Sequence, residues 1–226
     1  MRKTLLVLLV LAACGRPLTP TETGMARDLM GDSLDTAPVR FAELGLIGLR
    51  EVTYPARPRI TCRERIAPEP DRDHYVGRTA GAVAFNQVLT NPDFTVPDYM
   101  RGYPDEVHLV AAMFFAHELT HIWQWQNRAV TGYHPLRGAL EHKPGVDPYL
   151  FDPQADLTFL DLGYEQQAAL VEEFVCCRTL APEAARTERL WQVLSQAMPV
   201  THPMSVPPAR RVLGVDAEAD LDGICD

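Results

Sequence analysis

The chain is poor in basic residues for its length. Its 226 residues include 21 Lys plus Arg against 30 Asp plus Glu, which gives a formal net charge of -9. A protein that follows nucleic-acid phosphates needs a basic face, so the composition excludes this class of partner. Hydrophobic residues make up 46% of the chain, which is enough to fill a core and excludes disorder for most of it.

The sequence also lacks an apolar run long enough to cross a bilayer, which takes about 20 residues. Its N-terminal apolar run, Leu5–Leu11, follows Arg2 and Lys3 and precedes two small alanines. This order of a basic, an apolar and a small-residue region predicts a secretory signal peptide over residues 1–13.

A cysteine follows the signal directly. The order Leu11-Ala12-Ala13-Cys14 resembles the bacterial lipoprotein signal, and the resemblance implies that Cys14 becomes the lipidated first residue after cleavage. Gly15 stands next, in place of the aspartate that tends to retain such proteins at the inner membrane. We therefore expect a lipid-anchored protein of the bacterial cell envelope, on the periplasmic side of the outer membrane. The alternative is an ordinary cleaved signal whose first mature residue is a cysteine.

Four further cysteines remain, and none of them stands at the C-x-x-C spacing of a cysteine zinc site. An oxidising compartment favours disulfides. Cys176 and Cys177 are adjacent, and adjacent cysteines rarely bond each other because the peptide between them strains the ring. We therefore expect Cys62 and Cys225 to pair with one of them each.

Composition shifts divide the chain into three parts after the signal. We expect a lipidated, polar tether over 14–25, a folded domain over 26–198 and a Pro-rich, acidic tail over 199–226. The strongest helix covers Asp105–Val130, because apolar residues occupy much of its circumference. The other expected elements are helices over 25–34, 164–180 and 182–198, an extended stretch over 39–53, a strand over 81–89, and loops over 97–104 and 133–156.

Residues 117–121 read His-Glu-Leu-Thr-His, an H-E-x-x-H motif inside the strongest helix. Four helical residues turn through about 400°, so His117 and His121 project from one face and can hold one metal ion. Neutral imidazoles suit Zn²⁺ better than Ca²⁺ or Mg²⁺. Glu118 is rotated by about 100° and lies beside the metal, where it can act as a general base on a bound water. The alternative is a pair of hydrogen-bonded histidines in a buried helix.

A catalytic zinc site needs a third protein ligand and one open position. The metzincin pattern requires a glycine and a histidine where this chain has Gln124 and Asn127. We prefer Glu165, because the small residues one turn after it allow its helix to approach the histidine helix closely. Glu172 lies on nearly the same face, about 10 Å further along the axis, and is the alternative ligand or an outer partner of a histidine. Glu165 is also explained by the preference for acids at helix N-termini.

The segment FAHELTHIWQ over 115–124 resembles the AHELTH core of a bacterial family of metallopeptidase domains that occur in secretion-associated and contractile-injection proteins. The segment YEQQA over 164–168 is similar to a helix of such proteins in which the first glutamate, here Glu165, is the third zinc ligand of the gluzincin type. The resemblance implies an α+β, zincin-like fold with a small sheet before the motif helix and a helical part after it. The chain departs from the pattern at Ala169, where the best-known gluzincins have an aspartate.

Peptide hydrolysis also needs a group that stabilises the oxyanion. Tyr133, His134 and His142 follow the motif helix and are candidates, with plain loop residues as the alternative. The resulting hypothesis is an envelope lipoprotein with a zinc-dependent peptidase domain, whose sheet edge binds an extended peptide or protein substrate. The alternatives are a non-catalytic zinc-binding or adaptor module of the envelope and a metal-dependent cell-wall amidase.

Overall fold

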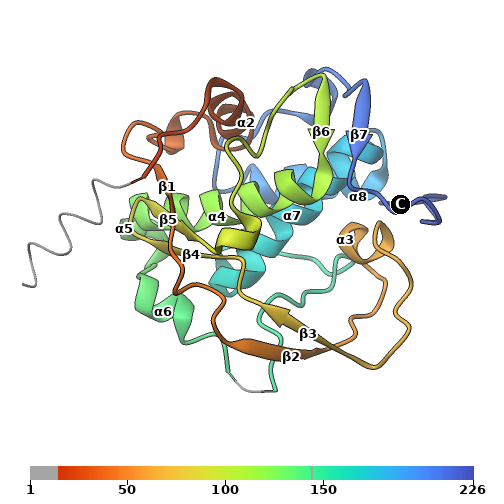
Figure 1. The fold of residues 1–226 in the computed structure, drawn as a ribbon. Helices are drawn as coiled ribbons and strands as arrows, with labels where there is room; N and C mark the ends of the chain where they lie inside the picture. The colour runs from red at the N-terminus through yellow and green to blue at the C-terminus, as the bar shows by residue number, and fades with distance from the viewer. Residues whose placement is uncertain (1–14, 144) are drawn as a thin grey trace, which may run out of the picture.

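Two buried helices form the centre of the protein. The computed structural model describes residues 15–143 and 145–226. Helix α4 (Leu109–Gln126) and helix α7 (Tyr164–Leu180) pack side by side (Figure 1). Phe115 of α4 is fully buried, as expected for a motif helix that is apolar on most of its circumference, and Phe174 of α7 is fully buried as well. Short strands accompany the helices, so the α+β class predicted from the sequence is confirmed.

A three-stranded sheet contacts α4. Strand β1 (Arg40–Glu43) pairs in parallel with β5 (Gln87–Thr90), and β4 (Gly81–Ala84) pairs antiparallel with β5 at the edge of the sheet. The single strand predicted over 81–89 is wrong. Phe85 has a φ of 62°, and this left-handed conformation reverses the chain between β4 and β5.

Two strand pairs lie outside this sheet. Strands β2 (Glu51–Pro55) and β3 (His74–Arg78) form a largely exposed antiparallel ribbon, which stands apart from the helices in Figure 1. Strand β6 (Glu106–His108) pairs in parallel with β7 (Arg211–Leu213).

The motif helix is shorter than the sequence predicts at both ends. Residues 106–108 belong to β6, and the ring of His108 caps α4 by accepting a hydrogen bond from the amide of Ala111. After Gln126 a separate turn of helix, α5 (Arg128–Thr131), ends at Gly132, whose φ of 67° is in the left-handed region.

The N-terminal residues differ from the expected tether. The backbone of Arg16 exchanges hydrogen bonds with Phe41, and helix α2 (Pro20–Met30) begins five residues before the helix predicted over 25–34. Thr19 and Glu22 cap α2 reciprocally, so two polar residues of the supposed tether start a helix. Folded structure therefore begins close to the first described residue.

The C-terminal residues also differ from the expected tail, because they are tied to the helices. The two disulfides are Cys62–Cys176 and Cys177–Cys225, which confirms that Cys62 and Cys225 each bond one of the two adjacent cysteines. Cys225 is fully buried, and the 211–213 segment forms β7. The segment is therefore part of the folded domain in spite of its polar composition, because the disulfide and β7 hold it to the helices.

Short helices complete the fold. They are α3 (Cys62–Arg65), α6 (Pro135–Ala139), α8 (Ala185–Leu194), and the 3-10 turns η1 (Gly31–Ser33), η2 (Pro92–Phe94), η3 (Phe159–Asp161) and η4 (Pro203–Ser205). Helix α8 lies within the range predicted over 182–198. Within the described residues, no helix combines the length and the apolarity that a bilayer span requires. The predicted signal peptide and Cys14 lie outside the described residues.

Candidate metal centre

Helices α4 and α7 bring two imidazoles and one carboxylate together. His117 and His121 lie one turn apart on α4, and their Nε2 atoms are 3.2 Å apart. Oε2 of Glu165, in the first turn of α7, lies 3.3 Å from each Nε2 atom. The three residues are buried, with 8%, 5% and 6% of their surface exposed. Their ligand atoms lie close enough to hold a metal ion.

Small residues on α7 allow this close approach. Ala168 and Ala169 are buried one turn after Glu165 and place little volume between the two helices. Glu141, from the segment before α7, accepts hydrogen bonds from the amides of Tyr164 and Glu165 at 2.9 Å each. The carboxylate of Glu141 thereby caps the first turn of α7, where an acid is favourable, and fixes the backbone of Glu165.

Polar partners hold the other nitrogen of each imidazole. Oε1 of Glu172 lies 2.6 Å from Nδ1 of His117. Oε1 of Gln124 lies 2.8 Å from Nδ1 of His121, and the amide of Gln124 donates to Gln167. Both Nε2 atoms are thereby left facing Glu165. Glu172 supports His117 although Ala169 stands where the gluzincin pattern has an aspartate, and Gln124 supports His121 where metzincins have a glycine.

The buried histidines and glutamates of this cluster stabilise each other's charged forms. Burial by itself lowers the pKa of His117, but contacts with Glu165 and Glu172 outweigh it and raise this pKa to about 10. Burial raises the pKa of Glu165, but the neighbouring histidines, His121 first, outweigh it and hold the pKa well below its usual range. Without a metal ion, the group therefore favours a protonated His117 against ionised carboxylates.

Glu118 lies on α4 beside the ligand group and against strand β4. It is 5% exposed, and burial raises the pKa of its carboxyl. A Cβ atom added to Gly81 of β4 would lie 2.7 Å from Oε1 of Glu118, so glycine at this point of the strand lets the carboxylate keep its position. A buried carboxylate with a raised pKa next to a metal site can take up and return a proton.

The candidate oxyanion residues are placed differently from one another. The ring of Tyr133 stacks on His121 with a centroid distance of 5.8 Å, and burial raises the pKa of its hydroxyl. Nε2 of His142 lies 3.0 Å from Oε1 of Glu165, the oxygen that does not face His121. His134 is not brought to the group: its ring caps α6 and packs on Trp125.

Sequence reasoning missed Tyr149. Its ring lies 5.7 Å from the ring of His117 and 5.7 Å from the ring of His142, with Arg57 above it at 5.2 Å. No spacing rule connects residue 149 with the motif, because the segment before α7 is irregular and folds back over α4. The only signal was that this segment carries Tyr, His and Asp residues between prolines.

A second group of potential ligands belongs to the disulfides. The sulfur atoms of Cys62, Cys177 and Cys225 lie within 4.8 Å of one another and are buried. Each of these sulfurs is bonded to another cysteine sulfur, so no thiolate is free to bind a metal ion there.

Comparison with solved structures supports the fold. The effector domain of Pseudomonas aeruginosa VgrG2b aligns with a TM-score of 0.52 and 23% sequence identity, over 80% of this chain and 85% of that chain. The chain shares the fold of an effector domain. No protein-family model and no curated protein matches it. The resemblance to secretion-associated domains, noted from the sequence, thus has a structural counterpart at the level of the fold.

Proposed function

We propose that this protein is a zinc-dependent peptidase with a zincin-like fold. His117, His121 and Glu165 would hold the zinc ion, and Glu118 would activate the attacking water. The observation that carries the proposal is the meeting of three ligand atoms from α4 and α7 at separations of 3.2, 3.3 and 3.3 Å.

These separations fit zinc. Zinc binds nitrogen and oxygen ligands at about 2.0–2.2 Å, so the corners of its tetrahedron are about 3.3–3.6 Å apart. The three observed separations fall close to that spacing. The donors are two imidazoles and one carboxylate, which is the set of several catalytic zinc sites, and it leaves the fourth corner open. When bound, zinc would lower the pKa of a water to about 7 and polarise a carbonyl.

The chain's own residues have distinct tasks in this proposal. Glu118 takes a proton from the attacking water and delivers it to the leaving amine, a role that suits its raised pKa. Glu172 and Gln124 keep the imidazoles in the tautomer whose Nε2 faces the ion. Tyr133, beside His121, is the candidate for contact with the oxyanion.

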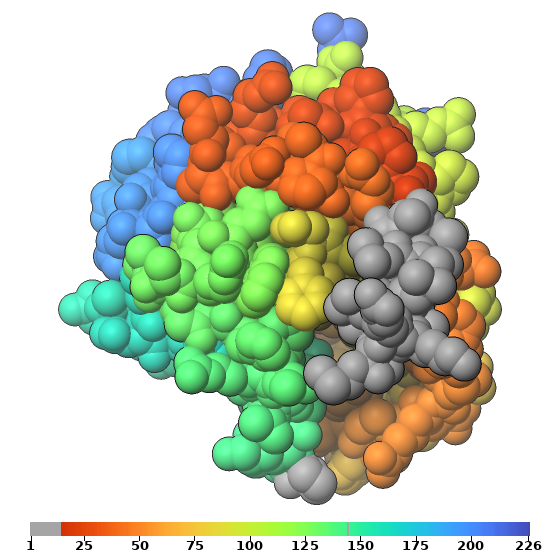
Figure 2. Space-filling view, turned by 90° about the vertical axis from the view of Figure 1, so that its left-hand side faces the viewer, coloured from red at the N-terminus to blue at the C-terminus, as the bar shows by residue number. Residues whose placement is uncertain are grey.

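An extended peptide would bind along β4. This strand is the edge of its sheet, so its outer backbone groups can pair with a substrate strand. Gly81 brings the strand against Glu118, and Figure 2 shows the β4–β5 hairpin, in yellow, at the surface beside the green residues of α4 to α6. Phe85 at the tip of the hairpin packs edge-on against Trp125 with ring centroids 4.8 Å apart, which fixes the hairpin to α4.

We further propose that the mature protein is a lipoprotein of the bacterial cell envelope, anchored through Cys14 after removal of residues 1–13. The two disulfides support an oxidising compartment. Metabolic labelling with a fatty acid should mark the parent protein and not a Cys14→Ser variant. Equal labelling of both would contradict the anchor.

Metal analysis tests the site first. The chain from residue 15 onward, purified gently, should contain about one zinc per chain. The His117→Ala and Glu165→Ala variants should lose it, whereas His134→Ala is a matched control outside the group. A zinc content far below one in the parent would contradict the proposal.

Activity is tested with Glu118→Gln. The parent should cleave members of a peptide library, and the variant should retain zinc but lose most of the cleavage, by a factor on the order of 100 or more. Zinc without cleavage in the parent would favour a non-catalytic zinc module. Cleavage of cell-wall fragments, but not of peptides, would favour an amidase.

A further inference from the structure

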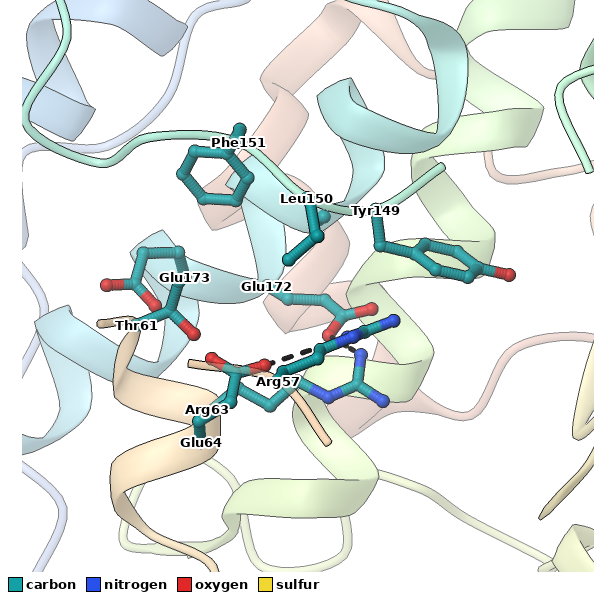
Figure 3. Close-up of a pocket in the computed structure, with 10 residues that line it drawn as sticks. Arg57, Thr61, Arg63, Glu64, Tyr149, Leu150, Phe151, Glu172 and Glu173 are labelled. Atoms are coloured by element: carbon teal, nitrogen blue, oxygen red, sulfur yellow. Dashed lines mark hydrogen bonds and ion pairs between the residues drawn. The ribbon is translucent and has the colours of Figure 1, made fainter. Parts of the chain in front are cut away.

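Glu172 links the metal site to a surface arginine. One oxygen of Glu172, Oε1, lies 2.6 Å from Nδ1 of His117, and the other, Oε2, accepts a hydrogen bond from Arg63 at 2.7 Å. Figure 3 shows the carboxylate of Glu172 next to the guanidinium groups of Arg57 and Arg63 that line a small pocket. The contacts therefore run from a half-exposed arginine through a buried carboxylate to a candidate ligand.

The charge of Arg63 matters because Glu172 is buried. The glutamate is 5% exposed, and an unpaired buried carboxylate is costly. The hydrogen bond from Arg63 satisfies Oε2 and orients the carboxylate, so that Oε1 can accept a hydrogen bond from Nδ1 of His117.

Arg63 depends on a disulfide for its place. It lies on α3, which is only four residues long and whose N-cap residue, Thr61, makes no side-chain capping hydrogen bond. Such a short helix is not stable by itself. Its first residue, Cys62, is bonded to Cys176, which lies four residues after Glu172 and hence one turn along α7. The amide of Cys62 also donates to Oε2 of Glu173 at 2.7 Å.

We propose that Arg63 is a positioning residue of the metal centre and that the Cys62–Cys176 disulfide holds it against Glu172. This inference rests on the proposed function, because it assumes that His117 binds zinc. Arg63 touches neither the ion nor a substrate. It acts through Glu172, whose orientation sets the ring position of His117, and outer partners of this kind commonly change metal affinity by about 10–100-fold.

The test measures zinc affinity by competition with a chromogenic chelator, using the chain from residue 15 onward. Arg63→Ala should weaken zinc binding about 10–100-fold. Arg63→Lys, which keeps the charge, should recover much of this loss. Arg65→Ala is the matched control: Arg65 lies on the same helix, but its side chain donates to the carbonyls of Asp220, Asp222 and Gly223.

The disulfides supply a second comparison. The double variant Cys62→Ala/Cys176→Ala should weaken zinc binding by a factor similar to that of Arg63→Ala, and adding Arg63→Ala to it should change little further. The double variant Cys177→Ala/Cys225→Ala removes the other disulfide, which bonds no residue of α3, and should bind zinc nearly as the parent does.

Stability and affinity separate the two possible roles of Arg63. The side chain of Arg63 is 46% exposed, so its truncation leaves no core cavity, and Glu172 keeps His117 as a partner at 2.6 Å. The thermal unfolding of the metal-free protein should therefore shift much less than that of the zinc-loaded protein. A parental zinc affinity in Arg63→Ala, or an equal loss in Arg65→Ala, would overturn the inference. If Cys62→Ala/Cys176→Ala does not fold, the arginine variants decide. A parent that binds no zinc would overturn the proposed function itself. A zinc affinity that does not depend on Arg63 would overturn only the positioning role of Arg63.

Discussion

Zinc added to the metal-free protein at neutral pH should displace a proton from His117. Burial lowers the pKa of this imidazole, but Glu165 and Glu172 outweigh it and raise the pKa to about 10. A metal ion binds the neutral ring, so zinc must displace this proton. At pH 7 the solution is about three pH units below the pKa of the ring. At 1.36 kcal/mol per unit this costs roughly 4 kcal/mol.

The direction of the pH dependence follows. Below a pH of about 10, His117 in the metal-free protein carries the competing proton, so the apparent zinc affinity should fall about tenfold through His117 for each unit that the pH falls. Isothermal titration calorimetry at pH 8, in buffers of different ionisation enthalpy, gives the number of protons released per zinc. A zinc-bound water with a pKa of about 7 would add to that number in any variant that keeps the open position.

The Glu172→Gln variant shows how many of the protons released on zinc binding come from His117. It removes one of the two carboxylates that raise the pKa of His117, so it should release a clearly smaller number of protons per zinc at pH 8. Equal proton release by parent and variant, together with an affinity that does not change between pH 6 and pH 9, would refute the reasoning.

Three further changes test separate parts of the protein. Gly81→Ala would place a Cβ 2.7 Å from Oε1 of Glu118, so the carboxylate must shift, and peptide turnover should fall on the order of 100-fold while zinc content stays the same. His142→Ala removes the partner 3.0 Å from Oε1 of Glu165 and should weaken zinc binding about tenfold in the chelator competition. Burial raises the pKa of Glu173 to about 7, so the folded protein binds its proton more tightly than the unfolded chain does. Between about pH 4.5 and pH 7 the metal-free parent should therefore lose up to about 3 kcal/mol of stability as the pH rises, and Glu173→Gln should lack this loss in urea unfolding.

Each of these tests has a control or a decisive outcome. Gly45→Ala has open space at the Cβ position and should leave turnover unchanged. His134→Ala should leave zinc affinity unchanged, and an effect as large as that of His142→Ala would mean that the contact with Glu165 is not the cause. For Glu173, parallel pH profiles of parent and variant would contradict the buried, protonated carboxyl.

The helices and the proposed ligands on them could be predicted from the sequence because they depend on local spacing. The period of the apolar residues predicts α4 and α7, and H-E-x-x-H places His117 and His121 on one face whatever the rest of the fold. Boundaries were less accessible. Residues 106–108 read as the first turn of the helix, but they pair with β7, a segment more than 100 residues away in the sequence.

The outer parts of the site depend on contacts between distant segments. Glu141 caps α7 from 24 residues before Glu165, and Arg63 reaches Glu172 across 109 residues. Tyr149 lies beside His117 because an irregular segment folds back over α4. The free-energy cost of closing a loop depends only weakly on its length. Many sequence separations are therefore similarly accessible, and no local pattern predicts which distant residues meet.

The sequence by itself determined the two-histidine motif and the helices that carry the proposed ligands. Through the adjacency of Cys176 and Cys177 it also predicted that these two do not bond each other, whereas only the structure decided which of them bonds Cys62. Spacing along a helix and strain in a short ring are properties of a few neighbouring residues. Only the tertiary structure decided between Glu165 and Glu172 as the carboxylate that faces both Nε2 atoms. Both glutamates lie on one face of α7, and which of them meets the histidines depends on how α7 is positioned along α4. That position is set by the packing of the whole core and not by α7 alone.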